Sequence, residues 1–272
     1  MQIQKAAGFA GAYVSDIQLV DISTAKKAEL EQALFDHGVL FLRNQAISPY
    51  EFRELALTFG EIESHPAYTE VDRVPGVQIL ESTPDEPTKI EKWHSDMTFT
   101  RTPPSLTFLH AQILPRWGGD TLWANTSAAY LALSEPVRKM LSGLSAVHDF
   151  SFGFRESISE PGGYERLKDA IAANPPLEHP VIRTHPVTGR KSLYVNELFT
   201  VRIEGLGSLE SRTLLDMLYR HIIREEFTVR LQWQQNTIAI WDNRTTQHKP
   251  INDYFPQHRR LHRVTVSGEQ PV

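Results

Sequence analysis

The chain has 272 residues, with 28 Lys and Arg against 33 Asp and Glu, which gives a formal net charge of −5. This acidic balance disfavours a basic nucleic-acid-binding protein. Hydrophobic residues make up 40 % of the chain and charged residues 22 %. Such proportions are typical of an ordinary globular protein with a full core, so global disorder is excluded.

The chain contains no Cys and 11 His. Disulfides, iron–sulfur clusters and thiolate nucleophiles are therefore excluded, and any metal must bind His, Asp or Glu. The longest apolar run is Val39–Leu42, far below the about 20 residues that a membrane span needs. The first residues carry no basic-then-apolar export pattern. We expect a soluble, cytoplasmic protein with no membrane or nucleic-acid partner.

The first half of the chain combines two helices with short strands. A helix is expected over Thr24–His37, and a capping box at Ser48 with Pro49 at the first helical position starts another, which ends at Gly60. Alternation of apolar and polar residues predicts strands at Val77–Leu80, Thr107–Leu114 and Thr121–Ala124.

The second half begins with Ser151–Glu178, whose weak periodicity predicts an irregular insertion that lies over a site. A helix follows over Leu209–Arg224, where apolar residues keep the 3.6-residue period. Further strands are predicted at Ser192–Val195, Thr228–Trp233, Thr237–Trp241 and Leu261–Val266. Many short strands with few helices predict a mainly β, α+β fold of sandwich or jelly-roll type, in a single domain over residues 1–272.

The candidate metal site starts from His94 and Asp96, which point to the same face if their segment is a strand. His248 is followed by Arg259 after eleven residues and by Arg263 after fifteen. The two arginines are four apart in a strand-like segment and therefore share a face, where they could hold two anions at different depths. Two His and one carboxylate on a β scaffold are the ligand set of non-haem Fe(II) oxygenases.

Several motifs extend this pattern over nearly the whole chain. In chain order they are HPxY from His65, WHxDxTF from Trp93, GGDTLW from Gly118, HPVxG from His185, VNE from Val195, WDNR from Trp241 and HR at His262. In order and spacing the chain resembles the Fe(II)/2-oxoglutarate-dependent dioxygenases of the TauD/TfdA family, the taurine dioxygenases among them. The resemblance implies a double-stranded β-helix (jelly-roll) core.

The resemblance also implies the role of each matching residue. His94, Asp96 and His248 would bind Fe(II), while Thr121 and Arg259 would bind the distal carboxylate of the co-substrate 2-oxoglutarate. Guanidinium and hydroxyl groups suit a carboxylate. The primary substrate, a small anion, would contact His65, Tyr68, Phe154, Phe199 and Arg263. Hydroxylation at the carbon that bears a sulfonate would release sulfite and an aldehyde, with succinate and CO2 as co-products.

Two positions depart from the taurine pattern. Ile90 stands where an Asn is expected near the substrate amine, and Gly153 stands where a Ser is expected before the pocket Phe. Both changes remove polar groups, and an ammonium is costly to bury without acceptors. The departures favour an anion with a less polar tail, so alkyl sulfonates, alkyl sulfates and aryloxy-carboxylates stay open.

Other interpretations remain at this point. The same three ligands suit a zinc hydrolase, which has no evident need for a Thr121–Arg259 clamp, and a jelly roll can bind an anion or metal without turnover. Arg263 could form a structural ion pair, and His65 could cap a loop. The resemblance is also compatible with a homo-oligomer.

Overall fold

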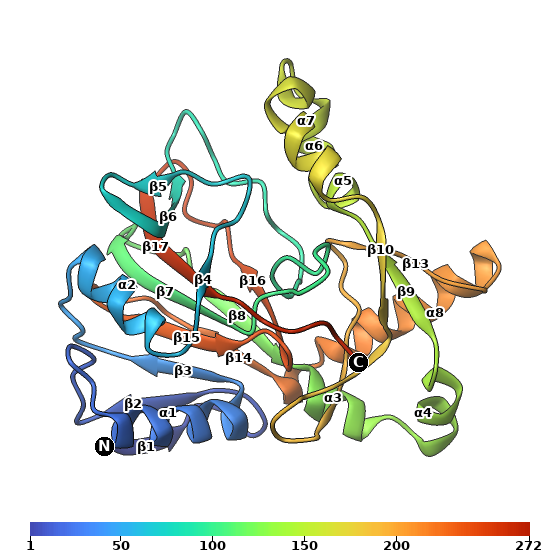
Figure 1. Cartoon of the computed structure of the whole chain (residues 1–272), viewed down its shortest axis with the longest axis horizontal. Coiled ribbons are helices and arrows are strands. Elements are labelled where there is room, and N and C mark those ends of the chain that lie inside the picture. The colour runs from blue at the N-terminus through green and yellow to red at the C-terminus, as the bar shows by residue number, and fades with distance from the viewer.

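The computed structural model describes residues 1–272, and two β-sheets packed face to face form its centre (Figure 1). The larger, nine-stranded sheet contains, in spatial order, β1 (Gln2–Lys5), β2 (Ala12–Ser15), β3 (Val39–Leu42), β15 (Ile238–Asp242), β7 (Leu106–Ile113), β17 (Arg259–Val266), β6 (Val74–Ser82) and β5 (Glu70–Val71), with β4 (Ile62–Glu63) also on β17. The smaller sheet has the order β14 (Thr228–Leu231), β8 (Thr121–Asn125) and β16 (Thr246–Pro250). The larger sheet joins strands from both ends of the chain.

The central strands of the larger sheet are buried on both faces, which explains the uninterrupted apolar run of β3. Leu40 and Leu42 face the helices, whereas Val39 and Phe41 face the smaller sheet. The layer between the sheets is rich in aromatic residues, with Trp123 of β8 and Trp241 of β15 in edge contact at 5.6 Å between ring centroids. Side chains of alternating direction thus build both layers of the core.

Helices cover the outer face of the larger sheet and flank the smaller one. Along the chain they are α1 (Thr24–His37), α2 (Pro49–Leu57), α3 (Thr126–Ala132), α4 (Glu135–Leu141), α5 (Phe150–Gly153), α6 (Arg155–Ser159), α7 (Gly163–Ala173) and α8 (Ser208–Ile222), with a short 3₁₀ helix at Glu225–Phe227. The predicted helices α1, α2 and α8 are confirmed, and the Ser48 capping box is present at α2. None of the helices has the length and apolar character that crossing a membrane requires.

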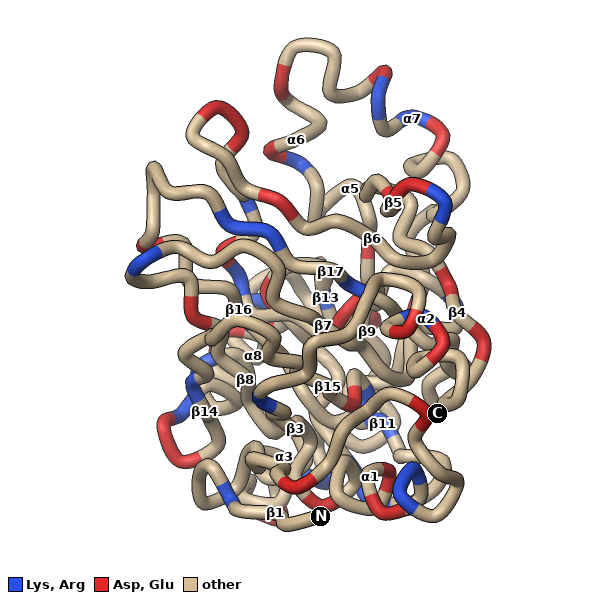
Figure 2. The backbone as a smooth tube through the Cα atoms, turned by 90° about the vertical axis from the view of Figure 1, so that its left-hand side faces the viewer, with Lys and Arg blue, Asp and Glu red and all other residues tan.

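Small sheets complete the fold beside α8. They consist of β10 (Leu177–Pro180), β9 (Ser145–His148) and β13 (Thr200–Ile203), and of β11 (Ile182–Thr184) with β12 (Lys191–Leu193). The predicted α+β fold with many short strands is therefore confirmed. Acidic and basic residues are interspersed along the chain trace (Figure 2).

The prediction of an irregular insertion over Ser151–Glu178 was wrong, because this segment contains most of α5 and all of α6 and α7. The helices project from the body of the molecule (Figures 1 and 2). They are short, and few of their side chains are buried: Phe150 and Leu167 pack with Phe99 and Phe199. A narrow buried face over brief helices leaves little periodicity for the sequence to display. The segment does reach the candidate site, through Phe154 between α5 and α6.

Two buried histidines away from the site make the stability of the fold sensitive to acid. His110 of β7 and His179 of β10 are 1 % and 3 % exposed. Burial, together with nearby His262, lowers the pKa of His110 to about 4, and burial lowers the pKa of His179 to about 4. The unfolded chain protonates both imidazoles below about pH 6.5. Both imidazoles are neutral in the folded and unfolded chain above about pH 6.5, so they leave the free energy of unfolding unchanged there. As the pH falls from about 6.5 toward 4, only the unfolded chain gains protons, and the free energy of unfolding decreases.

We expect the free energy of unfolding to be lower at pH 5 than at pH 7.5 by about 2 kcal/mol for each of these imidazoles. Urea denaturation at the two pH values measures this difference. His110→Gln should reduce this difference between pH 7.5 and pH 5 by about 2 kcal/mol, the amount expected for one imidazole. Equal pH dependence in the wild type and His110→Gln would contradict the assignment.

Candidate functional site

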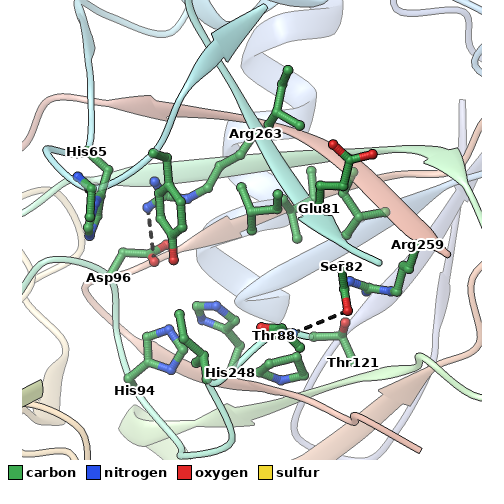
Figure 3. Close-up of a pocket in the computed structure, with 18 of the residues that line it drawn as sticks. His65, Glu81, Ser82, Thr88, His94, Asp96, Thr121, His248, Arg259 and Arg263 are labelled. Carbon is green, nitrogen blue, oxygen red and sulfur yellow. Dashed lines mark hydrogen bonds and ion pairs between the residues drawn. The ribbon is translucent and has the colours of Figure 1, made fainter. Parts of the chain in front are cut away.

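A cavity of about 330 Å³ opens between the two sheets, and Figure 3 shows residues that line it. Phe154, between α5 and α6, also lines this cavity. All ten residues that the sequence predicts for the site line this cavity: His65, Tyr68, His94, Asp96, Thr121, Phe154, Phe199, His248, Arg259 and Arg263. They come from positions up to 198 residues apart in the chain, so the fold alone brings them together.

The three candidate metal ligands meet at the bottom of the cavity. One ligand atom each of His94, Asp96 and His248 lies within 4.8 Å of the others, and all three side chains are buried. The segment that contains His94 and Asp96 is not a strand. Only His94 pairs with a strand, as an isolated bridge in which it exchanges two backbone hydrogen bonds of 3.0 and 2.7 Å with His248 of β16. This bridge places the two imidazoles side by side, with ring centroids 4.2 Å apart.

A second set of hydrogen bonds orients the ligands. Nδ1 of His94 lies 2.9 Å from the carbonyl of Lys92, which leaves its Nε2 free to face the site. The Thr107 hydroxyl donates to Oδ2 of Asp96 at 2.7 Å, and the Asn243 amide donates to that hydroxyl at 2.7 Å. Oδ1 of Asn243 in turn accepts the indole N–H of Trp241 at 2.9 Å. Hydrogen bonds from neighbouring residues that fix the orientation of the ligand side chains are typical of metal sites.

The protonation states suit a divalent metal. Burial lowers the pKa of His248 to about 3 and also lowers the pKa of His94, so both imidazoles are neutral near pH 7. Burial disfavours ionisation of Asp96, but Arg263 and the two histidines outweigh burial and hold the pKa of this carboxyl well below its usual value. Two neutral imidazoles and one carboxylate are the forms that bind Fe(II).

One end of the cavity holds a buried cation beside hydroxyl groups. Arg259 begins β17 opposite Ser82 of β6, and Figure 3 shows its guanidinium near Thr121. Its Nε donates to the carbonyl of Gly119 at 3.1 Å. Thr121 accepts the indole N–H of Trp233 at 3.0 Å, so its own proton is free for another acceptor. This end of the cavity can bind a carboxylate.

The other end holds Arg263, four residues further along β17. Its guanidinium lies 3.0 Å from Oδ1 of Asp96 and donates to the side-chain oxygen of Gln78 at 2.9 Å. The predicted pair of cationic side chains on one face is thus present. The alternative that Arg263 forms an ion pair is also observed. Its partner is Asp96, which is a candidate metal ligand.

His65 lies near Arg263, lines the cavity and caps its own loop. Its Nδ1 accepts the backbone N–H of Ala67 at 3.1 Å and so caps the loop. Burial, with a smaller effect of nearby Arg263, lowers the pKa of His65 to about 3. The imidazole is therefore neutral, with the proton on Nε2, and can donate into the cavity. The rings of Tyr68 and Phe154 lie 4.6 and 5.7 Å from it and form an apolar wall.

Sequence reasoning missed several contributors to the site, namely Gln78, Thr107, Trp233 and Tyr254. Each lies in a strand or loop with no motif of its own. The sequence does give a sign of Gln78, because it is a polar residue between apolar residues of β6. In the structure it is fully buried. The sequence gives no such sign of Tyr254.

Comparisons with known proteins agree with this geometry. Residues 2–265 match the model of the family described as "Taurine catabolism dioxygenase TauD, TfdA family". An alkylsulfatase of Acinetobacter baylyi is 37 % identical over 276 residues, covering 99 % of this chain and 86 % of the relative. An alpha-ketoglutarate-dependent sulfate ester dioxygenase of Pseudomonas putida is 35 % identical, covering 100 % of this chain and 91 % of the relative.

Solved structures agree as well. A taurine dioxygenase from Burkholderia xenovorans superimposes with a TM-score of 0.85 at 32 % identity, over 100 % of this chain and 90 % of that chain. The predicted jelly-roll core is thereby confirmed. The chain belongs to the TauD/TfdA family of dioxygenases.

Proposed function

We propose that this protein is an Fe(II)- and 2-oxoglutarate-dependent dioxygenase that hydroxylates a small anionic organosulfur compound. The observation that carries the proposal is one cavity that contains a His94–Asp96–His248 ligand set and two buried arginines at different depths. A zinc hydrolase has no evident need for a Thr121–Arg259 clamp, and neither it nor a binding module without turnover accounts for the match to dioxygenases.

The residues present fit the iron and its co-substrate. Two oriented imidazoles and a carboxylate would hold Fe(II) and leave further coordination positions open. Arg259 and Thr121 would hold the distal carboxylate of 2-oxoglutarate, because both can direct unused donors into the cavity. When bound, iron and 2-oxoglutarate would supply the oxidant for cleavage of a C–H bond, which no side chain can supply.

The protein would then position the substrate. Arg263 and the Nε2–H of His65 would bind the sulfonate or sulfate group, while Tyr68, Phe154 and Phe199 would enclose the carbon next to it and exclude water. 2-Oxoglutarate would lose CO2 and take up one oxygen atom of O2 to become succinate, and the other oxygen atom would enter the C–H bond of the substrate. The hydroxylated carbon loses sulfite from a sulfonate, or sulfate from a sulfate ester, and becomes an aldehyde.

Taurine or an alkyl sulfonate is the substrate class that the motifs favour, and alkyl sulfates are the main alternative. The latter gains support from the relatives named for sulfate esters and from the apolar side chain of Ile90 in the cavity wall. Aryloxy-carboxylates are a third option, since a relative in Cupriavidus pinatubonensis, 28 % identical, is named for 2,4-dichlorophenoxyacetate. The cytoplasmic location and the homo-oligomer stay predictions.

The test is anaerobic reconstitution with Fe(II) and 2-oxoglutarate, followed by O2 with taurine, longer alkyl sulfonates, alkyl sulfates and aryloxy-acids in parallel. Succinate coupled to sulfite would establish a sulfonate substrate, and succinate coupled to sulfate would establish a sulfate ester. Succinate without either product would indicate a carboxylate. No substrate-dependent succinate in any arm, with iron bound, would reject the proposal.

Gly153 offers a specific prediction about the shape of the substrate pocket. A Cβ atom at this position would lie 2.4 Å from Cδ1 and Cε1 of Phe199. Phe199 stands between Gly153, in a neighbouring groove, and the main cavity, where its ring packs 6.2 Å from that of His94. A methyl group behind the ring would push it into the cavity.

We therefore expect Gly153→Ala to raise the KM for the longest accepted substrate about tenfold, with a smaller effect on the shortest. Gly153→Ala combined with Phe199→Leu should restore much of the loss, because the smaller side chain yields to the methyl group. Steady-state kinetics over a series of chain lengths measures both effects. An equal change in KM for all chain lengths would show that Phe199 does not border the substrate tail.

A further inference from the structure

We propose that the Tyr254 hydroxyl is a third donor to the distal carboxylate of 2-oxoglutarate, beside Arg259 and Thr121. This inference rests on the co-substrate assigned above. Tyr254 lies in the loop between β16 and β17 and lines the same cavity.

The hydroxyl of Tyr254 is one of several buried polar atoms that the protein itself leaves without a hydrogen bond. The side chain is 3 % exposed, and its hydroxyl is buried without a hydrogen-bond partner. A buried hydroxyl that lacks a partner costs about 1–3 kcal/mol. Such a group is normally retained where a ligand or a water completes it.

The ring of Tyr254 lies at the carboxylate end of the cavity, beside Arg259. The centroid of the Tyr254 ring lies 5.7 Å from the guanidinium carbon of Arg259. Burial lowers the pKa of the Arg259 guanidinium. The loop is held in place because the neighbouring Asp253 accepts the backbone N–H of Gly119 at 2.8 Å. Tyr254, Arg259 and the turn before Thr121 therefore form one assembly.

The charge at this end of the cavity also lacks a partner. Arg259 is 7 % exposed and forms no ion pair, because the nearby carboxylate of Asp120 is bound by Arg230 at 2.6 Å. A buried guanidinium without a carboxylate is costly, so an anionic ligand stabilises it.

The number of donors matches a carboxylate. An ionised carboxylate has about four acceptor sites. The two terminal nitrogens of Arg259 fill two of them, the Thr121 proton fills a third, and the Tyr254 proton fills the fourth. Without Tyr254, one lone pair of the buried carboxylate would have no donor.

Equilibrium binding without O2 tests this assignment and does not depend on turnover. 2-Oxoglutarate is titrated into the Fe(II)-loaded wild type and into Tyr254→Phe under nitrogen. 2-Oxopentanoate, in which a methyl group replaces the distal carboxylate, is titrated in parallel. We expect Tyr254→Phe to weaken 2-oxoglutarate binding about tenfold and to leave 2-oxopentanoate binding unchanged.

Tyr194→Phe is the matched control. Tyr194 is also 3 % exposed with a hydroxyl that lacks a partner, but it does not line the cavity, so its removal should leave both affinities unchanged. An equal affinity of wild type and Tyr254→Phe for 2-oxoglutarate, or an equal loss with both oxo acids, would overturn the role of Tyr254 alone. A wild type that binds no 2-oxoglutarate would overturn the proposed function as well.

Discussion

Replacing His94 or His248 with Ala is expected to abolish Fe(II) binding and to reduce turnover below detection. Each imidazole supplies one of three protein ligands, and the ligand atoms lie within 4.8 Å of one another. Removing one leaves two ligands, and the remaining carboxylate is then paired with Arg263 rather than shared with a metal. An Fe(II) titration of the protein under nitrogen measures the loss, and succinate release after addition of O2 measures the turnover.

The control for this experiment is a histidine outside the site. His37 ends α1 and does not line the cavity, so His37→Ala should bind iron and turn over as the wild type does. Far-ultraviolet circular dichroism of all variants confirms that they fold. Iron binding retained by both His94→Ala and His248→Ala would falsify the ligand assignment.

The outline of the site was predictable because the motifs of the chain resemble, in order and spacing, those of the TauD/TfdA family. The alternation in β17 correctly placed Arg259 and Arg263 on one face, since four residues along a strand return to the same side. The motifs brought His94, Asp96 and His248 into one candidate site, although the segment around His94 is not a strand. The bridge between His94 and His248 depends on a partner 154 residues away, which local periodicity cannot show.

The parts that were missed depend on tertiary contacts. Helices α5 to α7 are brief, and their buried residues pack against the aromatic cluster around Phe99 rather than forming a long stripe. The ion pair of Arg263 with Asp96 joins two residues that the sequence assigned to different ligands. Tyr254 contributes through a loop whose shape is set by Asp253 and the Gly118–Gly119 turn. Spacing in the chain carries no information about such contacts.

Arg259→Ala and Arg263→Ala are expected to affect different ligands of the enzyme. Arg259→Ala should raise the KM for 2-oxoglutarate about 100-fold, which corresponds to roughly 3 kcal/mol for the loss of a buried charged donor, with little change in the KM for the primary substrate. Arg263→Ala should show the reverse pattern. The reason is that Arg259 lies beside Thr121, whereas Arg263 lies beside Asp96 and Gln78.

Arg263→Ala carries a second expected effect that separates it from Arg259→Ala. Loss of this guanidinium leaves Oδ1 of Asp96 without its cationic partner, while Thr107 still holds Oδ2. The carboxylate then binds Fe(II) without competition from Arg263, so the iron affinity should be unchanged or higher even though the primary substrate binds poorly.

Arg260→Ala is the neighbouring control, since Arg260 pairs with Glu81 and does not line the cavity. Steady-state kinetics with each substrate varied in turn, together with Fe(II) titration, measures all three quantities. Equal losses for both substrates in both variants would show that the two arginines do not bind separate anions.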